Sequence, residues 1–183
     1  LAVLALLGAV AVAGILSSDA LDEFQKKRLL TFVNPDDSSS AAAYNTRQAQ
    51  IAIASGGFSG EGFLDGEQTQ GGGVPEQQTD FIFTVAGEEL GFVGAAAIIV
   101  LLGIVVWRAM RIALRAEDMF GRLVAAGIVC WFTFQMFENI GMTLGIMPMT
   151  GVPLPFVSYG GSSMFASLMA VGLLENVHMR RYA

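Results

Sequence analysis

The run from Leu90 to Trp107 constrains the fold most, because it has eighteen consecutive residues without a charged side chain. An α-helix needs about 20 mostly apolar residues to cross the hydrocarbon core of a bilayer. Residues 123–147, interrupted by Glu138, and residues 157–174 have a similar character. With 54% hydrophobic and 14% charged residues, the chain is predicted to be an all-α polytopic membrane protein.

Residues 1–16 are apolar throughout and are predicted to be the end of a transmembrane helix. They lack an initial Met and the basic n-region of a signal peptide, so we expect the chain to be the C-terminal part of a longer protein. Cys130 is the only cysteine, which excludes a disulfide framework, and the single His178 gives no cluster of metal ligands.

The distribution of charge predicts how the segments are oriented. Residues 17–89 contain twelve acidic and four basic residues, whereas arginines gather around the connection 114–122 and in the tail 178–183. Short loops rich in Lys and Arg stay in the cytoplasm. We therefore expect the large acidic loop to face the outside. The predicted membrane helices are 90–113, 123–144 and 160–177, with an extracellular, re-entrant-like loop at 145–159.

The large outer loop contains signals of ordered structure. Residues 41–55 are predicted to form a short amphipathic helix. The glycines at 56–62 and 71–73 mark backbone that is either flexible or tightly turned. Loops as long as residues 17–89 are usually functional or disordered, and the ordered signals favour function.

Asp80 lies where this loop meets the apolar sequence that follows it. Thr79 and Asp80 precede a helical pattern, so Asp80 is either a helix N-cap or a chemical group. Thr79 could cap the helix alone, and Glu76 lies one turn earlier. Two carboxylates beside an apolar wall are typical of a general base or a cation site.

Three further acidic residues lie close to or within the apolar runs. Glu88 and Glu89 are expected at the outer headgroup level, with a structural ion pair as the expected role. Glu138 is deeper and is predicted to face the bundle or an aqueous cavity, where a cation from another helix could pair with it.

Residues 148–163 contain three prolines and three glycines, which exclude a continuous helix. Irregular backbone at membrane depth is tolerated only when it is buried in protein or lines an aqueous cavity. The segment is therefore either a rigid turn into the last helix or a surface of amides and hydroxyls suited to sugar or phosphate oxygens. Both interpretations stay open, as they do for Lys26, Lys27 and Arg28, which are either solvated or bind an anionic headgroup.

Three motifs together resemble the SEDS family of bacterial shape, elongation, division and sporulation proteins. They are PEQQTDFIFTVAGEELG at 75–91, IASGGFSGEG at 53–62 and GIMPMTGVPLPFVSYGGSS at 145–163. The resemblance implies the C-terminal helices of a ten-helix bundle and a peptidoglycan glycosyltransferase that polymerises lipid II. It also implies that the protein lies in the bacterial inner membrane. Thr150 and the residues that follow it resemble the sequence of the elongation branch of the family, RodA.

The resemblance also places the family's essential acidic residue at Asp80. Because a sugar hydroxyl is a poor nucleophile and needs a base, we expect Asp80 to be the general base of a single inverting displacement. A divalent cation, Mg²⁺ or Mn²⁺, held by Asp80 and Glu76 would stabilise the leaving pyrophosphate. No organic cofactor is expected. The substrate-binding residues predicted beside Asp80 are Glu76, Thr79, Arg28, Lys27, Arg47, Ser158, Gly160, Gly161 and Ser162.

The expected partners are a class B penicillin-binding protein, other membrane proteins of the elongation complex, lipid II and membrane lipids, and no nucleic acid. Three alternatives remain. They are a division-branch (FtsW-like) glycosyltransferase, a flippase or transporter for a lipid-linked precursor, and a scaffold that only recruits the penicillin-binding protein.

Overall fold

The computed structural model describes residues 41–72 and 77–180, and the chain divides into two units, 1–44 and 45–183. The contacts discussed below lie in the second unit. The predicted helix end at 1–16 falls outside the described residues, as do Lys27, Arg28 and Glu76.

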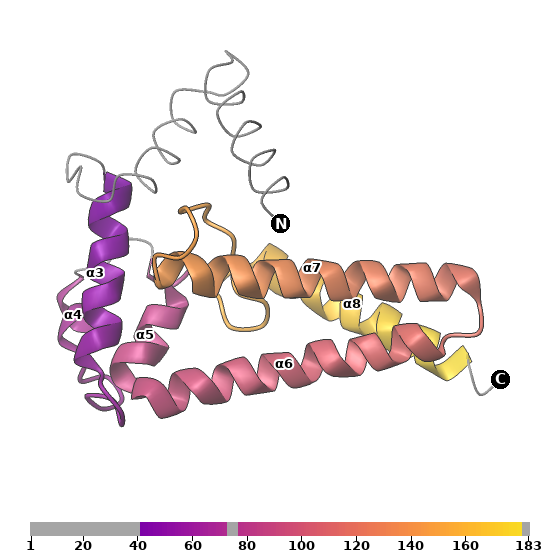
Figure 1. Cartoon of the computed structure of the whole chain (residues 1–183), viewed down its shortest axis with the longest axis horizontal. Helices are drawn as coiled ribbons and strands as arrows, with labels where there is room; N and C mark the ends of the chain where they lie inside the picture. The colour runs from indigo at the N-terminus through magenta and orange to yellow at the C-terminus, as the bar shows by residue number, and fades with distance from the viewer. Residues whose placement is uncertain (1–40, 73–76, 181–183) are drawn as a thin grey trace, which may run out of the picture. The chain divides into compact units, whose positions relative to one another are not determined.

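The described part is built from helices alone, which confirms the all-α prediction (Figure 1). The helices are α3 (Ala41–Ser55), α4 (Glu67–Gly71), α5 (Ile82–Glu89), α6 (Gly91–Arg115), α7 (Met119–Thr143) and α8 (Gly161–Arg180).

Two of the helices, α6 and α7, are long and apolar enough to cross a membrane. Each has 25 residues, and a helix of that length spans about 37 Å, more than the roughly 30 Å of a bilayer's hydrocarbon core. The third predicted span corresponds to α8, which is not among the helices that meet this length and hydropathy test.

Helix α7 begins at Met119, before the predicted start of its span at residue 123. The reason is Asp118, the N-cap residue, whose Oδ2 accepts a hydrogen bond from Gly121 N at 3.1 Å. An N-cap oxygen satisfies one of the unpaired amides of the first turn. Only residues 116–118 therefore remain between α6 and α7.

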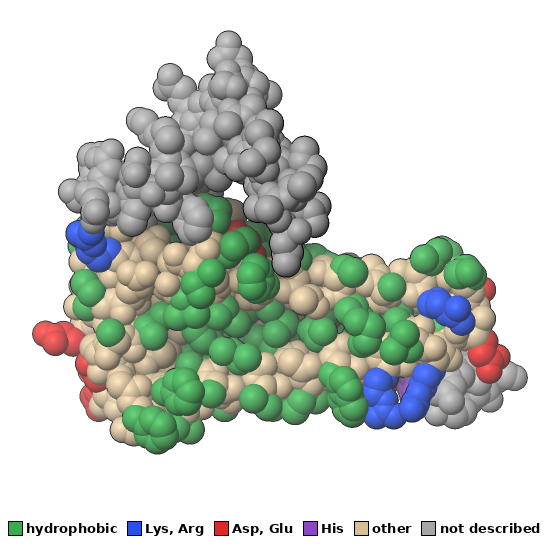
Figure 2. Space-filling view, in the orientation of Figure 1, with side chains coloured by type: hydrophobic (Ala, Val, Ile, Leu, Met, Phe, Trp, Pro, Cys, Tyr) green, Lys and Arg blue, Asp and Glu red, His purple; other side chains and the backbone are tan. Residues whose placement is uncertain are grey.

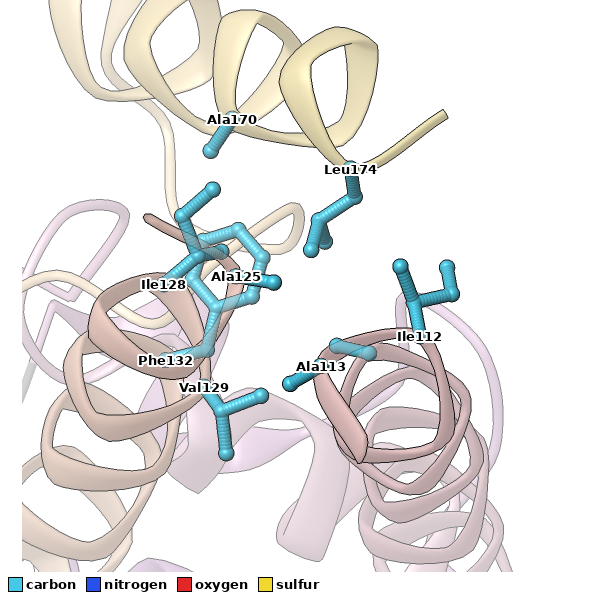
Figure 3. Packing of buried hydrophobic residues seen from close by; sticks show 9 residues of the cluster. Ile112, Ala113, Ala125, Ile128, Val129, Phe132, Ala170 and Leu174 are labelled. Carbon is cyan, nitrogen blue, oxygen red and sulfur yellow. The ribbon is translucent and has the colours of Figure 1, made fainter. Parts of the chain in front are cut away.

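The core between α6, α7 and α8 is built from small and branched side chains and one aromatic ring, that of Phe132 (Figure 3). Alanines let helix backbones approach closely, which favours helix packing in membranes. The buried residues of this cluster are Ala109, Ile112, Ala113, Ala125, Ile128, Val129, Phe132, Ala170 and Leu174.

A second buried cluster joins α5 and α6 to the irregular segment between α7 and α8. Phe83, Ala95 and Leu102 pack with Leu154 of that segment. Phe156, from the same segment, meets Phe132 of α7 edge-on at 5.3 Å between ring centroids. The segment is therefore packed into the protein by its own apolar side chains.

The surface of the second unit separates apolar from basic side chains. Figure 2 shows hydrophobic side chains over the face formed by α6 and α7, with Lys and Arg side chains at the end where these helices connect. Within α6, Arg111 lies 4.8 Å from the ring centroid of Trp107. A guanidinium at that distance is attracted to the electron-rich face of an indole ring.

Candidate active site

The loop that follows α3 is held against the α5–α6 junction by backbone contacts. Phe92 N donates to the Gly57 carbonyl at 3.0 Å, and Glu61 N donates to the Glu88 carbonyl at 3.0 Å. A Cβ on Gly56 would lie 2.6 Å from that Glu88 oxygen, so only glycine permits this approach. Of the two alternatives, flexible or tightly turned backbone, these glycines therefore belong to the second.

The Glu88 side chain connects the same junction to α4. Its carboxylate is fully buried and accepts hydrogen bonds from Gln68 N at 2.6 Å, from Thr69 N at 3.1 Å and from Thr69 Oγ1 at 2.7 Å. Within the described residues its partners are therefore groups of α4 and not the cation that the sequence predicted. Gln77 Nε2 donates to Thr69 Oγ1 at 3.0 Å, which ties α4 to the turn before α5.

Asp80 ends that turn, residues 77–80, and lies one residue before the N-cap position of α5. The cap position is Phe81, which makes no side-chain capping hydrogen bond. Phe81 is fully buried with Ala49 of α3, and Met149 packs against the two. Thr79 and Asp80 therefore precede the cap position by two residues and by one residue.

The carboxylate of Asp80 lies against the backbone of Gly151. A Cβ on residue 151 would be 2.9 Å from Asp80 Oδ2. Gly151 has a φ of +76°, a conformation that favours glycine. The absence of a side chain at residue 151 therefore lets the Gly151 backbone lie this close to the acidic group.

Two consecutive residues of α7 bind the turn that carries Asp80 and the segment 150–152. Asn139 Nδ2 donates to the carbonyls of Asp80 and Val152, each at 2.8 Å. Next to it, Glu138 Oε1 accepts from Thr150 Oγ1 at 2.9 Å. Glu138 is 2% exposed and thus faces the protein interior, and the partner identified for it is a hydroxyl group.

A pocket of about 450 Å³ lies between the turn before α5 and the start of α8, and Asp80 is not among the residues that line it. Tyr159 N donates to the Gln78 carbonyl at 2.9 Å, which brings the two segments together. The residues that line the pocket are Gln78, Ile82, Val157, Ser158, Tyr159, Gly160, Gly161 and Met164.

The residues predicted to bind substrate do not all lie in one place. Gly160 and Gly161 line the pocket, and Ser162 is exposed in the first turn of α8. Ser158 is 3% exposed, and its hydroxyl accepts from Leu154 N at 2.7 Å, so this side chain closes its own loop. Arg47 is exposed on α3. The roles predicted for these residues stay predictions.

Asn139 and Gly151, which touch the Asp80 segment directly, were not predicted as site residues. A signal existed for Asn139, because a polar side chain inside an apolar run requires hydrogen-bond partners. For the predicted cation, no group of three His, Cys, Asp or Glu side chains lies close enough to hold a metal among residues 41–72 and 77–180. The donor set on which that prediction rests includes Glu76, which those ranges omit.

Comparison with known proteins places the whole chain in one family. The sequence profile of the cell cycle proteins FtsW, RodA and SpoVE matches residues 1–183. The chain is 40% identical to the peptidoglycan glycosyltransferase MrdB of Escherichia coli K12, over 88% of this chain and 44% of MrdB. It is 44% identical to the probable peptidoglycan glycosyltransferase FtsW of Trichlorobacter lovleyi, over 84% of this chain and 40% of that relative.

The chain thus spans less than half the length of these relatives, and relatives with the two names match at similar identity. Two solved structures have the same fold. One is a peptidoglycan synthase complex described for the coordination of polymerization and crosslinking, with 33% identity, a TM-score of 0.74, and coverage of 97% of this chain and 49% of that chain. The other is a mutant of the rod shape determining protein RodA of Thermus thermophilus, with 28% identity, a TM-score of 0.57, and coverage of 94% and 63%.

Proposed function

Because the chain belongs to the SEDS family of cell cycle proteins, we propose that the whole protein is a peptidoglycan glycosyltransferase that polymerises lipid II. The resemblance predicted from the three motifs is confirmed over the full chain. The chain is a membrane protein by its two long apolar helices and by its relatives. Its similarity to the peptidoglycan glycosyltransferases MrdB and RodA supports the proposed activity.

The observation that carries the proposal is that Asp80 lies against Gly151 and stands in the chain between Gln78 and Ile82, which both line the pocket at Gly160 and Gly161. A sugar hydroxyl is a poor nucleophile, so a base must accept its proton as the attack proceeds. Asp80 accepts the proton of the acceptor hydroxyl. The hydroxyl oxygen then forms a glycosidic bond to the anomeric carbon of the donor, and the bond from that carbon to the lipid pyrophosphate breaks, with inversion.

The pyrophosphate that leaves must be stabilised as negative charge accumulates on it. A divalent cation would supply this stabilisation, and Asp80 with Glu76 would hold it. The basic side chains proposed for the same purpose are Lys27, Arg28 and Arg47. Removal of Mg²⁺ and Mn²⁺ with a chelator during the polymerisation assay tests the cation, because polymer made at an unchanged rate would exclude it.

The proposed setting is the bacterial inner membrane, with the large loop outside and the arginine-rich α6–α7 connection in the cytoplasm. The crosslinking complex among the similar structures supports a class B penicillin-binding protein as partner. Within the family we propose that the protein belongs to the elongation branch, because Thr150 resembles the residue of that branch. The division branch is the alternative, and complementation of cells depleted of either branch distinguishes the two.

The test of the activity is lipid II polymerisation by the purified full-length protein with its transpeptidase partner. Asp80→Asn keeps the size of the side chain but removes the base, so we expect polymer to fall below detection while the protein stays folded. Asp118→Asn is the matched control, because asparagine caps helices as well as aspartate and Asp118 lies at the other end of α7. Undiminished polymer from Asp80→Asn would refute the assignment of the base.

The same preparation tests the flippase alternative. A flippase would move lipid II across vesicle membranes whether or not polymer forms. We expect no movement of lipid II that depends on Asp80. If lipid II crosses the membrane while no polymer forms, the protein is a flippase and the proposed glycosyltransferase activity is wrong.

A further inference from the structure

Asn139 occupies an unusual position at the end of α7. Its side chain has no exposed surface, although it lies in a helix long and apolar enough to cross a membrane. Its amide nitrogen bonds two carbonyls that are far apart in sequence, Asp80 and Val152. The side chain therefore connects the turn that carries the proposed base to the segment that lies against it.

The orientation of the Asn139 amide follows from these partners, because only the NH₂ group can donate to two carbonyls. The other end of the amide, Oδ1, is buried and has no hydrogen-bond partner among the described residues. A buried acceptor without a partner costs about 1–3 kcal/mol. A residue chosen for stability alone would avoid this cost, so the position of Asn139 needs another explanation.

That explanation is geometric. The segment Thr150-Gly151-Val152 is held at one end by Glu138 and at the other by Asn139, with Gly151 between them. The Asp80 carbonyl shares the same NH₂ group, so Asp80 and Gly151 are fixed to one point of α7. A shift of about 1 Å in a catalytic group can cost as much as 100-fold in rate.

We propose that Asn139 is a positioning residue, which holds the Asp80 turn in register with residues 150–152. The proposal rests on the proposed function, since it assigns Asn139 a role through the base. It predicts an effect on the chemical step rather than on binding, because the Asn139 side chain is buried beneath the backbone that it holds.

Two variants separate positioning from packing. Asn139→Leu keeps the branched shape and the number of heavy atoms of the side chain but leaves two carbonyls without a donor. Asn139→Ala leaves space that a water can occupy, and a water can bridge two carbonyls. Positioning predicts that kcat falls 10- to 100-fold in Asn139→Leu and less in Asn139→Ala, with KM for lipid II changed less than about 3-fold. Packing predicts the opposite order, since leucine fills the site.

The control is Thr143→Val, one turn further along α7. Thr143 is equally buried, but its hydroxyl bonds Ile140 O within the same helix, so kcat should stay within 2-fold of the wild type. Melting temperature and size-exclusion profiles report folding. A normal kcat in Asn139→Leu, a reversed order of the two variants, or failure of both variants to fold would overturn the proposal. If the wild-type protein does not polymerise lipid II, or if Asp80→Asn polymerises it normally, the proposed function itself is refuted.

Discussion

The carboxylate of Asp80 and the backbone of Gly151 lie so close that a Cβ on residue 151 would be 2.9 Å from Asp80 Oδ2. The two residues are 71 positions apart, and the contact connects the turn before α5 with the segment after α7. Real Cβ atoms almost never approach an oxygen this closely, so the side chain at residue 151 decides whether Asp80 can keep its place.

The first prediction concerns Gly151→Ala in the full-length protein. The alanine Cβ would push against the carboxylate, and a residue with a Cβ pays roughly 1–2 kcal/mol for a positive φ. We expect polymerisation of lipid II to fall at least about 10-fold, which corresponds to about 1.4 kcal/mol. The initial rate of polymer formation measures the effect.

Gly72→Ala is the control for backbone strain. Gly72 has a φ of +65°, but a Cβ there meets nothing within 4 Å. This variant should lose a little stability and keep its polymerisation rate. Equal rates for Gly151→Ala and the wild type would show that Asp80 does not depend on this contact.

A second prediction concerns stability. Glu88 Oε2 accepts hydrogen bonds from Thr69 N and Thr69 Oγ1. In Glu88→Gln an NH₂ group takes the place of this oxygen and cannot accept them. Hydrogen bonds to charged groups contribute about 1.5–3 kcal/mol each, so the free energy of unfolding should fall by about 3 kcal/mol. Thr69→Val removes one bond to Glu88 and the bond from Gln77, but leaves both backbone amides bonded to the carboxylate, so it should cost less, about 2 kcal/mol. Thermal unfolding in detergent checks the order of the two variants, and an unchanged melting temperature for Glu88→Gln would contradict the observed network.

The third prediction compares two glycines of the loop that follows α3, Gly57 and Gly60. A Cβ on Gly60 would lie 2.5 Å from the carbonyl carbon of Glu89, whereas a Cβ on Gly57 would meet only Ser55 O at 4.0 Å. Gly60→Ala must therefore displace the loop from the α5–α6 junction, and overpacking of this kind typically costs 1–3 kcal/mol. We expect a clearly lower melting temperature for Gly60→Ala than for Gly57→Ala. Equal melting temperatures would mean that the loop is not docked on this junction.

The helices could be predicted from the sequence because they depend on local pattern. The absence of charge from Leu90 to Trp107 is sufficient to predict a membrane helix, and α6 begins at Gly91 and covers the rest of that run. The observed start of α7, Met119, lies before the predicted start at residue 123. Charged residues such as Asp118 predict a polar connection by hydropathy, although an acidic residue before an apolar run is also a typical N-cap. Helix ends are decided by single hydrogen bonds that a hydropathy pattern does not contain.

The contacts of the candidate site could be predicted only in part. Asp80 was identified by its position at the end of the loop and by the family motif. Its neighbours Gly151 and Asn139 depend on how α7 and the segment after it fold back, and neither residue has a local pattern that names its partner. The same applies to Glu88, whose partner helix α4 has only five residues within a sequence rich in glycine.

The last prediction concerns orientation, on which the role of Asp80 depends, since the base must face the side where glycan strands form. Ser59 is exposed in the loop that follows α3 and Glu117 in the α6–α7 connection, and Cys130 is the only cysteine of this chain. In a cysteine-free background, Ser59→Cys should react with a membrane-impermeant maleimide once the outer face of the inner membrane is accessible. Glu117→Cys should react only after the inner membrane is permeabilised, because the arginines on both sides of residue 117 keep this short connection in the cytoplasm. The reverse labelling pattern would place Asp80 on the cytoplasmic face, where it could not act on strands outside the cell.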